Sequence, residues 1–424
     1  MGEPGREAHR YTGGWFLFLL ACALRVGAGL VTGRLVRPEL FEYDGMARNL
    51  LAGNGLSYTH LGIVYHSFAP PLQSWVSAAS YWSTGSIVPA MLLQIVAGSA
   101  IAVVAAAIAQ RVFADRTAAV SAGILVAVHP GLVIYSATKS HPLSFDALFF
   151  TLALWTFFRL YDERTVTRAV VAGAVVGLGT LTRSTALIFL PIGAVWLIAV
   201  TPRARWPSAF RTIVLAGIAC VVVMLPWSIR DSLVHHRGLF LISTTGEDFW
   251  DGNNPYATGH SYIDADLAVI NALPPAERAD LERQPDEIAQ SQWFMDRATA
   301  FIAENPARAA RLTLAKFYHF WWFAPQTGVL YPTAWRRLYM AYYVGALALA
   351  ACGIWRLTHT GTPSAIRLSL LLGAFMLGLS VVQSIYYVEA RHRWAIEPML
   401  LAISGGGIAA LAGRGARSAV GVRS

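Results

Sequence analysis

Three acidic side chains lie close together just after the first long apolar stretch of the chain. They are Glu39, Glu42 and Asp44. At a membrane interface a carboxylate is less well solvated than in bulk water, so its pKa rises and it becomes a plausible general base for a hydroxyl or amine. The alternative is a solvated acidic loop that only marks the interface.

The same segment has the pattern of a short helix. Glu39, Tyr43 and Ala47 recur at helical spacing, and Gly53 and Gly55 are expected to end the helix. The candidate catalytic residues are Glu42, Glu39 and Asp44, and the candidate substrate-binding residues of this segment are Tyr43 and Arg48.

Three more polar side chains stand at the ends of apolar stretches. His141 and Asp146 begin one stretch, and Arg183 lies between two others. Ionisable groups are costly inside a membrane and usually have a function there, so we take all three as candidate substrate-binding residues. For His141 the alternative is a hydrogen-bonded interfacial histidine. Arg25, inside the first apolar stretch, is expected to be an internal ion-pair partner.

Two arginines near the C-terminus have the chemistry of a phosphate site. Arg391 and Arg393 flank His392 in a short polar segment, and a guanidinium can bind two phosphate oxygens at once. We predict that they hold the phosphate of a lipid carrier. The alternative is a pair of interfacial anchors whose long side chains reach the lipid headgroups.

These residues must be positioned by membrane-spanning helices. The 424 residues are 55% hydrophobic and only 13% charged, which is typical of an integral membrane protein. Stretches of about 18 or more apolar residues can cross a hydrocarbon core of roughly 30 Å. The pattern predicts about ten spans, near residues 14–33, 86–110, 117–135, 142–160, 166–183, 184–201, 210–228, 338–356, 366–386 and 393–412.

The charge distribution predicts the orientation of these spans. The net charge of +9 would suit nucleic acid in a soluble protein, but here the basic residues gather on one side of the predicted membrane, which the positive-inside rule makes cytoplasmic. Both termini then lie in the cytoplasm of a multi-pass protein of the plasma membrane. The segments 34–69 and 229–337 face outward. The short aromatic stretches 70–84 and 311–325 are assigned to the interface.

Three regions follow from this arrangement. They are an N-terminal transmembrane module (1–228) that carries the first outer loop, an outer region (229–337) with an amphipathic helix near 286–303, and a C-terminal transmembrane module (338–424). The three cysteines lie inside apolar stretches and predict neither a disulfide framework nor a metal site.

Six short motifs occur in order along most of the chain. They are Glu42-Tyr43 with Ala47-Arg48-Asn49-Leu50 and Gly53-Asn54-Gly55, then Ala69-Pro70-Pro71-Leu72, Leu181-Thr182-Arg183, Leu225-Pro226-Trp227-Ser228-Ile229-Arg230, Gly252-Asn253-Asn254-Pro255 with Thr258-Gly259, and Arg391-His392-Arg393 with Glu397-Pro398. Together they resemble glycosyltransferase family 39, which includes the dolichyl-phosphate-mannose protein mannosyltransferases and the aminoarabinose transferases of lipid A.

The resemblance implies an all-α polytopic membrane protein with a GT-C-like multi-helix bundle, a large first outer loop and a polyprenyl-phosphate sugar donor. It also implies an acidic residue in that loop that acts on the acceptor. The usual position of this residue, four before the tyrosine, holds Glu39 here, so Glu39, Glu42 and Asp44 stay in contention. The aminoarabinose branch has a Glu-Lys pair before the proline, where this chain has Phe68-Ala69, and that substrate is therefore not expected.

The expected reaction moves a sugar, with inversion, from the polyprenyl phosphate to a lipid, glycan or protein acceptor on the non-cytoplasmic face. A loop carboxylate would activate the acceptor while arginines hold the leaving phosphate. No nucleic-acid partner, cofactor or metal cluster is indicated, although the acidic loop could hold a divalent ion. The alternatives are a transporter or flippase of lipid-linked sugars and an assembly subunit without activity.

Overall fold

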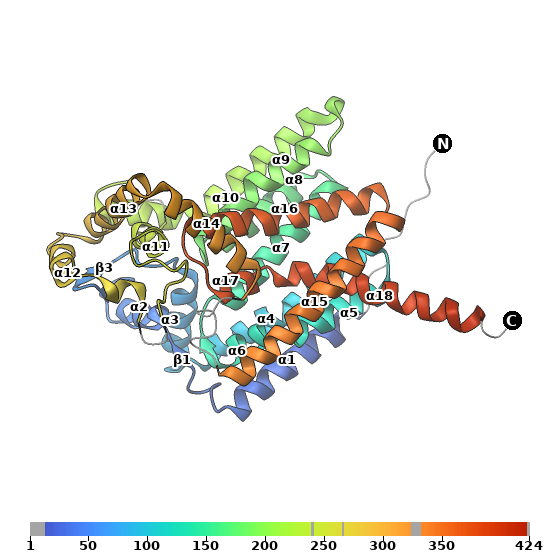
Figure 1. Ribbon diagram of the computed structural model, residues 1–424, viewed down its shortest axis with the longest axis horizontal. Coiled ribbons are helices and arrows are strands. Elements are labelled where there is room, and N and C mark those ends of the chain that lie inside the picture. The colour runs from blue at the N-terminus through green and yellow to red at the C-terminus, as the bar shows by residue number, and fades with distance from the viewer. Residues whose placement is uncertain (1–12, 239–240, 265–266, 324–331, 422–424) are drawn as a thin grey trace.

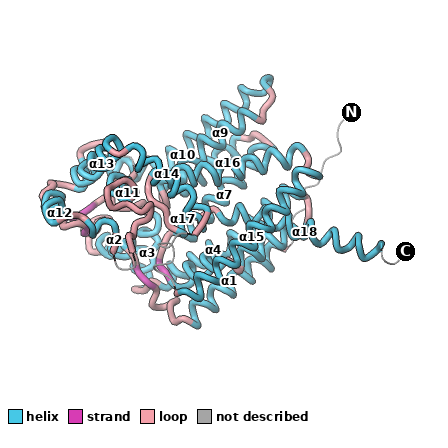
Figure 2. The backbone as a smooth tube through the Cα atoms, in the orientation of Figure 1, coloured by secondary structure: helices cyan, strands magenta, loops and turns pink. Residues whose placement is uncertain are grey.

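A computed structural model describes residues 13–238, 241–264, 267–323 and 332–421. Figure 1 shows a bundle of long helices with a smaller region of short elements packed at one end, and Figure 2 shows how little strand the molecule contains. The elements of the bundle are α1 (Gly14–Val31), α4 (Val88–Phe113), α5 (Arg116–Ala127), α6 (Pro130–Thr138), α7 (Leu143–Asp162), α8 (Val166–Thr180), η1 (Ser184–Ile188), α9 (Phe189–Ala199), η2 (Arg203–Arg205), α10 (Trp206–His235), α15 (Thr333–Thr360), α16 (Pro363–Ile385) and α18 (Glu397–Gly421).

The region at the end of the bundle contains the elements that lie in the predicted outer segments or next to them. They are β1 (Glu39–Leu40), α2 (Glu42–Leu51), β2 (Tyr58–His60), β3 (Ile63–Tyr65), α3 (Leu72–Thr84), β4 (Lys139–Ser140), α11 (Thr245–Asp251), η3 (Val269–Ala272), α12 (Pro275–Glu282), α13 (Glu287–Glu304), α14 (Pro306–Trp321) and α17 (Ala390–Trp394). The helix predicted near 286–303 is α13, which begins where the Asp286 carboxylate accepts the Ala289 N–H at 2.7 Å.

The number of membrane spans differs from the prediction. Among the described residues six helices are long and apolar enough to cross a membrane, or seven if α5 and α6, which meet at a bend of 47°, form one broken span. Three further apolar helices are shorter, Val166–Thr180, Ser184–Ala199 and Glu397–Gly413. All ten predicted segments contain helix, but the count of about ten spans is not confirmed.

Small residues let some of these helices pack very closely. Gly173 and Gly177 face α10, and a Cβ atom added at Gly173 would lie 1.9 Å from the Ala216 carbonyl oxygen. Glycines spaced in this way allow helix backbones to approach inside a membrane, where packing replaces the hydrophobic effect as the force between helices. The contact fixes the end of α8, which leads directly to Arg183.

Arg25 does not form the expected ion pair. Its guanidinium is fully buried, and Nη1 donates to the carbonyls of Ala21 at 3.1 Å and Ala127 at 3.4 Å. Ala127 ends α5, where the bend before Pro130 leaves helix carbonyls without their usual partners. Arg25 therefore supports the broken helix, and no carboxylate pairs with it in the described part of the chain.

Candidate active site

A cavity of about 640 Å³ lies where the bundle meets the end region. Its walls come from three parts of the chain: the α8–η1–α9 turn, the segment around α11, and the α16–α17 junction. The lining residues are Arg183, Ser184, Thr185, Leu187, Ile188, Pro191, Leu241, Ile242, Thr245, Asp248, Val382, Gln383, Tyr386, Tyr387 and His392.

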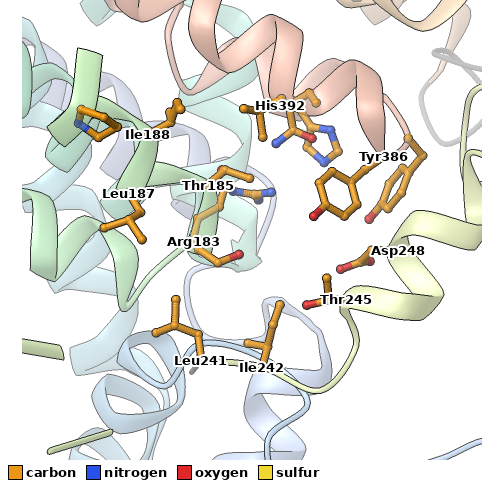
Figure 3. A pocket seen from close by; sticks show the side chains of 15 residues that line it. Arg183, Thr185, Leu187, Ile188, Leu241, Ile242, Thr245, Asp248, Tyr386 and His392 are labelled. Atoms are coloured by element: carbon orange, nitrogen blue, oxygen red, sulfur yellow. The ribbon is translucent and has the colours of Figure 1, made fainter. Parts of the chain in front are cut away.

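The cavity has an apolar side and a polar side. Figure 3 shows Leu187 and Ile188 on one side and Asp248 with Tyr386 on the other, while Arg183 points into the space between them. A ligand with an apolar tail, an anionic centre and a polar head would match this order of side chains.

Arg183 is oriented by a buried carboxylate. Its Nε lies 2.9 Å from Oδ2 of Asp146, which is fully buried near the start of α7. Within the described residues the two Nη groups of Arg183 make no hydrogen bond, so they remain as donors toward the cavity. Both residues are candidates predicted from the sequence, and the structure brings them together.

A two-residue strand pair brings the first outer loop to the same place. β1 and β4 are parallel, with Glu39 opposite Lys139. The pairing sets Tyr43, which is buried at the start of α2, against His141, whose ring centroid lies 6.1 Å away. Burial is the largest cause that raises the pKa of the Tyr43 phenol, and the nearby Glu42 charge adds to it. Tyr43 is therefore a neutral hydrogen-bonding group.

The three loop carboxylates have different surroundings. Glu39 is in β1 rather than on the predicted helix face, and its half-exposed side chain pairs with Lys139 at 2.5 Å. Asp44 is buried, pairs with Arg48 at 2.8 Å and accepts a hydrogen bond from the Tyr81 hydroxyl.

Glu42 differs from both. It is half-buried at the first position of α2 and, in the part of the chain that the structure describes, its carboxylate has no hydrogen-bond or ion-pair partner. Residues two apart on a helix point about 200° apart, so Asp44 faces α3 while Glu42 faces elsewhere. Burial is the largest cause that raises the pKa of Asp248 in the cavity wall, and the charge of Glu42 makes a smaller contribution in the same direction.

His141 supports the start of α7. Its Nδ1 accepts the Leu143 N–H at 3.1 Å, and its ring is buried against Phe41 and Tyr135. Burial, followed by the positive charges of Arg391 and Arg183, holds the pKa of His141 well below its usual value. A neutral, packed imidazole of this kind fits the structural alternative that the sequence left open.

The two C-terminal arginines are separated by α17. Arg393 is buried and fully engaged: it donates to Glu397 at 2.7 Å, to the Phe320 carbonyl at 2.9 Å and to the Tyr339 hydroxyl at 2.7 Å. The structure thus does not bring Arg393 to the cavity. Residues two apart on a helix point in different directions. Arg393 therefore points into a buried hydrogen-bond network, away from Arg391.

Arg391 lies nearer the cavity. Its Nε is 2.9 Å from Oε2 of Glu389, and its charge lowers the pKa values of His141 and His392. Of the two predicted arginines, Arg391 is therefore the one whose charge acts on a cavity-lining residue, His392.

Sequence reasoning missed the second wall of the cavity. Asp248 and Tyr386 belong to no predicted site, and His392 was noticed only as part of a motif. Burial is the main reason that the pKa of Asp248 rises to about 7 and that the pKa of His392 falls well below its usual value. The Glu247-Asp248 pair in a predicted outer segment was the available signal.

A buried lysine explains the Gly252-Asn253 motif. Lys316 of α14 donates to the Gly252 carbonyl at 3.1 Å, to Oδ1 of Asn253 at 3.1 Å and to the Ile385 carbonyl at 3.2 Å. A Cβ atom at Gly252 would lie 1.9 Å from the Tyr386 carbonyl oxygen, so only glycine fits there. These contacts join the end of α11, which carries Asp248, to the end of α16, which precedes Tyr386.

No set of three or more His, Cys, Asp or Glu side chains among the described residues is arranged to hold a metal ion. Arg183 and Asp248 are the basic and acidic side chains that line the cavity, and Glu42 and Arg391 are charged residues that are not part of its lining.

The chain is similar to known membrane glycosyltransferases. A family model described as dolichyl-phosphate-mannose-protein mannosyltransferase matches residues 69–229, which include Asp146 and Arg183. An archaeal oligosaccharyltransferase, AglB from Archaeoglobus fulgidus in complex with an inhibitory peptide and a dolichol-phosphate, matches with a TM-score of 0.54 and 13% identity over 94% of this chain and 50% of that chain.

Two further solved structures match. The apo form of the Archaeoglobus fulgidus oligosaccharyltransferase has a TM-score of 0.56 and 12% identity over 95% of this chain and 50% of that chain. ArnT from Cupriavidus metallidurans bound to undecaprenyl phosphate has a TM-score of 0.45 and 14% identity over 93% of this chain and 78% of that chain. This chain spans about half the length of the archaeal enzymes. The family match confirms the resemblance found in the sequence, and the archaeal enzymes share the fold.

Proposed function

We propose that this chain transfers a sugar from a polyprenyl-phosphate donor to an acceptor on the non-cytoplasmic face. The proposal is supported by the match of residues 69–229 to the mannosyltransferase family model and by the fold shared with the archaeal oligosaccharyltransferase. The acceptor is a lipid, glycan or protein with a free hydroxyl or amine. The donor kind is supported by the dolichol-phosphate in the complex of the similar archaeal oligosaccharyltransferase.

The observation that carries the proposal is the order of side chains across the cavity. Leu187 and Ile188 offer an apolar wall, Arg183 offers two free Nη groups, and Asp248 with Tyr386 offers hydrogen-bonding groups beyond them. A prenyl chain, a phosphate and a sugar follow one another in the same order along the donor. Arg391 does not line the cavity, but its positive charge, after burial and Arg183, lowers the pKa of the cavity-lining His392.

In the proposed mechanism Glu42 acts as the general base. Its carboxylate takes the proton of the acceptor, whose oxygen or nitrogen attacks the anomeric carbon as the bond from that carbon to the phosphate oxygen breaks. The electron pair leaves with the polyprenyl phosphate, whose added negative charge is stabilised by Arg183 and Arg391. A single displacement of this kind inverts the anomeric centre.

The test is to incubate membranes that contain the protein with radiolabelled polyprenyl-phosphate sugars and to measure both product and released polyprenyl phosphate. Release that depends on Glu42 and on the acceptor supports the proposal. A flippase, the alternative kept from the sequence, would move the donor between leaflets and leave it intact. Translocation of intact donor without any release of polyprenyl phosphate would reject the glycosyltransferase hypothesis and support the flippase.

A further inference from the structure

Asp248 is a cavity carboxyl group that the proposed chemistry does not use. It is half-buried on α11, and its side chain has no hydrogen-bond partner within the described residues. Figure 3 shows it directed into the cavity beside Thr245 and facing Tyr386. A carboxyl group left without a partner in a cavity wall is costly unless a ligand provides hydrogen bonds.

Other segments hold this carboxyl group in place. The chain before α11 is tied to the first outer loop, because Ser243 N–H donates to the Ser67 carbonyl at 2.8 Å and the Thr244 hydroxyl donates to the Phe68 carbonyl at 3.1 Å. The chain after α11 is tied to the end of α16, because the Asn253 amide donates to the Ile385 carbonyl at 2.8 Å. The position of Asp248 is therefore built by three parts of the fold.

Several charged residues act on the Asp248 carboxyl group. Burial is the largest cause that raises the pKa of Asp248, and the charges of Glu247 and, to a smaller extent, Glu42 add to it. Burial, Glu247 and then Asp248 raise the pKa of Asp251. The positive charges that act on Asp248 come from Arg183 and Arg391, which the proposed function assigns to the phosphate. Asp248 lies on a short helix, α11, that carries two further acidic residues, Glu247 and Asp251.

We propose that Asp248 is a specificity-determining residue that accepts hydrogen bonds from hydroxyls of the transferred sugar and makes the cavity select neutral sugars over uronic acids. This inference rests on the proposed function, since it takes the ligand to be a polyprenyl-phosphate sugar. A uronate would bring its carboxylate toward Asp248 and Glu42, and like charges facing each other in a poorly solvated site repel strongly.

The experiment measures equilibrium binding to the purified full-length protein in lipid nanodiscs, so that no acceptor is needed. The probes are a short-chain polyprenyl phosphate and three matched pairs of its glycosides: glucosyl and glucuronosyl, galactosyl and galacturonosyl, mannosyl and mannuronosyl. We expect the neutral member of the best-binding pair to bind at least about tenfold more tightly than its uronate. Asp248→Asn should reduce that ratio severalfold, because the amide keeps the size of the side chain and removes its charge.

A matched control is Asp296→Asn, which removes an exposed carboxylate of α13 that lies in the same outer region. It should leave the ratio at its wild-type value. Equal ratios in the wild type and in Asp248→Asn, with the unglycosylated polyprenyl phosphate still bound, would overturn the inference and leave the proposed function standing. Failure of the wild type to bind even the unglycosylated polyprenyl phosphate would instead remove the proposed function, and the inference with it.

A pH series gives a second readout. Because the pKa of Asp248 is raised to about 7, the group is mostly protonated at pH 6 and mostly charged at pH 8. The groups that face it are Glu42, Glu247, Asp251, Arg183, Arg391, Tyr386, Tyr387 and His392. The preference for the neutral sugar should therefore increase between pH 6 and pH 8 in the wild type and stay flat in Asp248→Asn. A wild-type preference that falls over this range would contradict the assigned role.

Discussion

The three carboxylates of the first outer loop should give three different results when each is converted to its amide. Glu42→Gln removes a half-buried carboxylate that has no partner among the described residues, so folding should change little. If Glu42 is the base, turnover should fall by about a hundredfold to ten-thousandfold, since general-base catalysis has that size. This loss corresponds to roughly 3 to 5 kcal/mol of transition-state stabilisation.

Asp44→Asn should act on stability instead. Asp44 is buried and accepts hydrogen bonds from Arg48 at 2.8 Å and from Tyr81. Its conversion weakens a charged hydrogen bond in a poorly solvated place, which costs about 1 to 3 kcal/mol. Glu39→Gln removes only a half-exposed ion pair with Lys139, worth about 0 to 1 kcal/mol. Both variants should keep turnover within about tenfold of the wild type. This decrease is much smaller than the decrease expected when a general base is lost.

The assay combines release of polyprenyl phosphate under single-turnover conditions with donor binding and thermal unfolding of each variant in detergent. Donor binding separates a lost base from a lost binding site, and thermal unfolding separates either from misfolding. Near-normal turnover of Glu42→Gln, with donor and acceptor verified, would refute the assignment. A large loss confined to Asp44→Asn or Glu39→Gln would move the base to that residue.

Two further predictions follow from the same structure. Arg393→Ala should destabilise the protein by about 3 to 5 kcal/mol because it leaves Glu397 buried without its arginine, whereas Arg391→Ala should fold normally and weaken donor binding by about 1.5 to 3 kcal/mol. Equal loss of donor affinity in two stably folded variants would restore both arginines to the phosphate site. For the orientation, a cysteine introduced at Tyr256 should react with an impermeant reagent added from outside and one at Arg205 should not, and the reverse pattern would place the cavity on the cytoplasmic side.

The sequence predicted the helical class and most of the segments, because apolar length alone reports a membrane helix. It could not tell a full span from a short one, as the helix Val166–Thr180 and the bent pair α5 and α6 show. The residue types of the site were also predicted in part. Asp146 and Arg183 could be named because charge near a membrane span is costly, but nothing in the sequence showed that they pair with each other.

The residues that the sequence grouped together and the structure separates share one physical feature. Glu42 and Asp44 are two residues apart, as are Arg391 and Arg393, and the sequence treated each pair as members of one polar loop. Both pairs lie on short helices, α2 and α17, where residues two apart point about 200° apart. Asp44 and Arg393 are then buried in internal networks, while Glu42 and Arg391 point in other directions.

The cavity depends on contacts between segments that are far apart in the chain. Trp227 donates to the Leu241 carbonyl at 2.8 Å, which sets one wall, and the buried Lys316 joins Gly252 and Asn253 to the end of α16, which sets the opposite wall. Lys316 makes these bonds without a carboxylate partner among the described residues, and burial lowers its pKa to about 8. An ammonium in such a place is held by carbonyl and amide oxygens. The position of the end of α11 beside the end of α16 therefore depends on a tertiary contact that no local sequence pattern encodes.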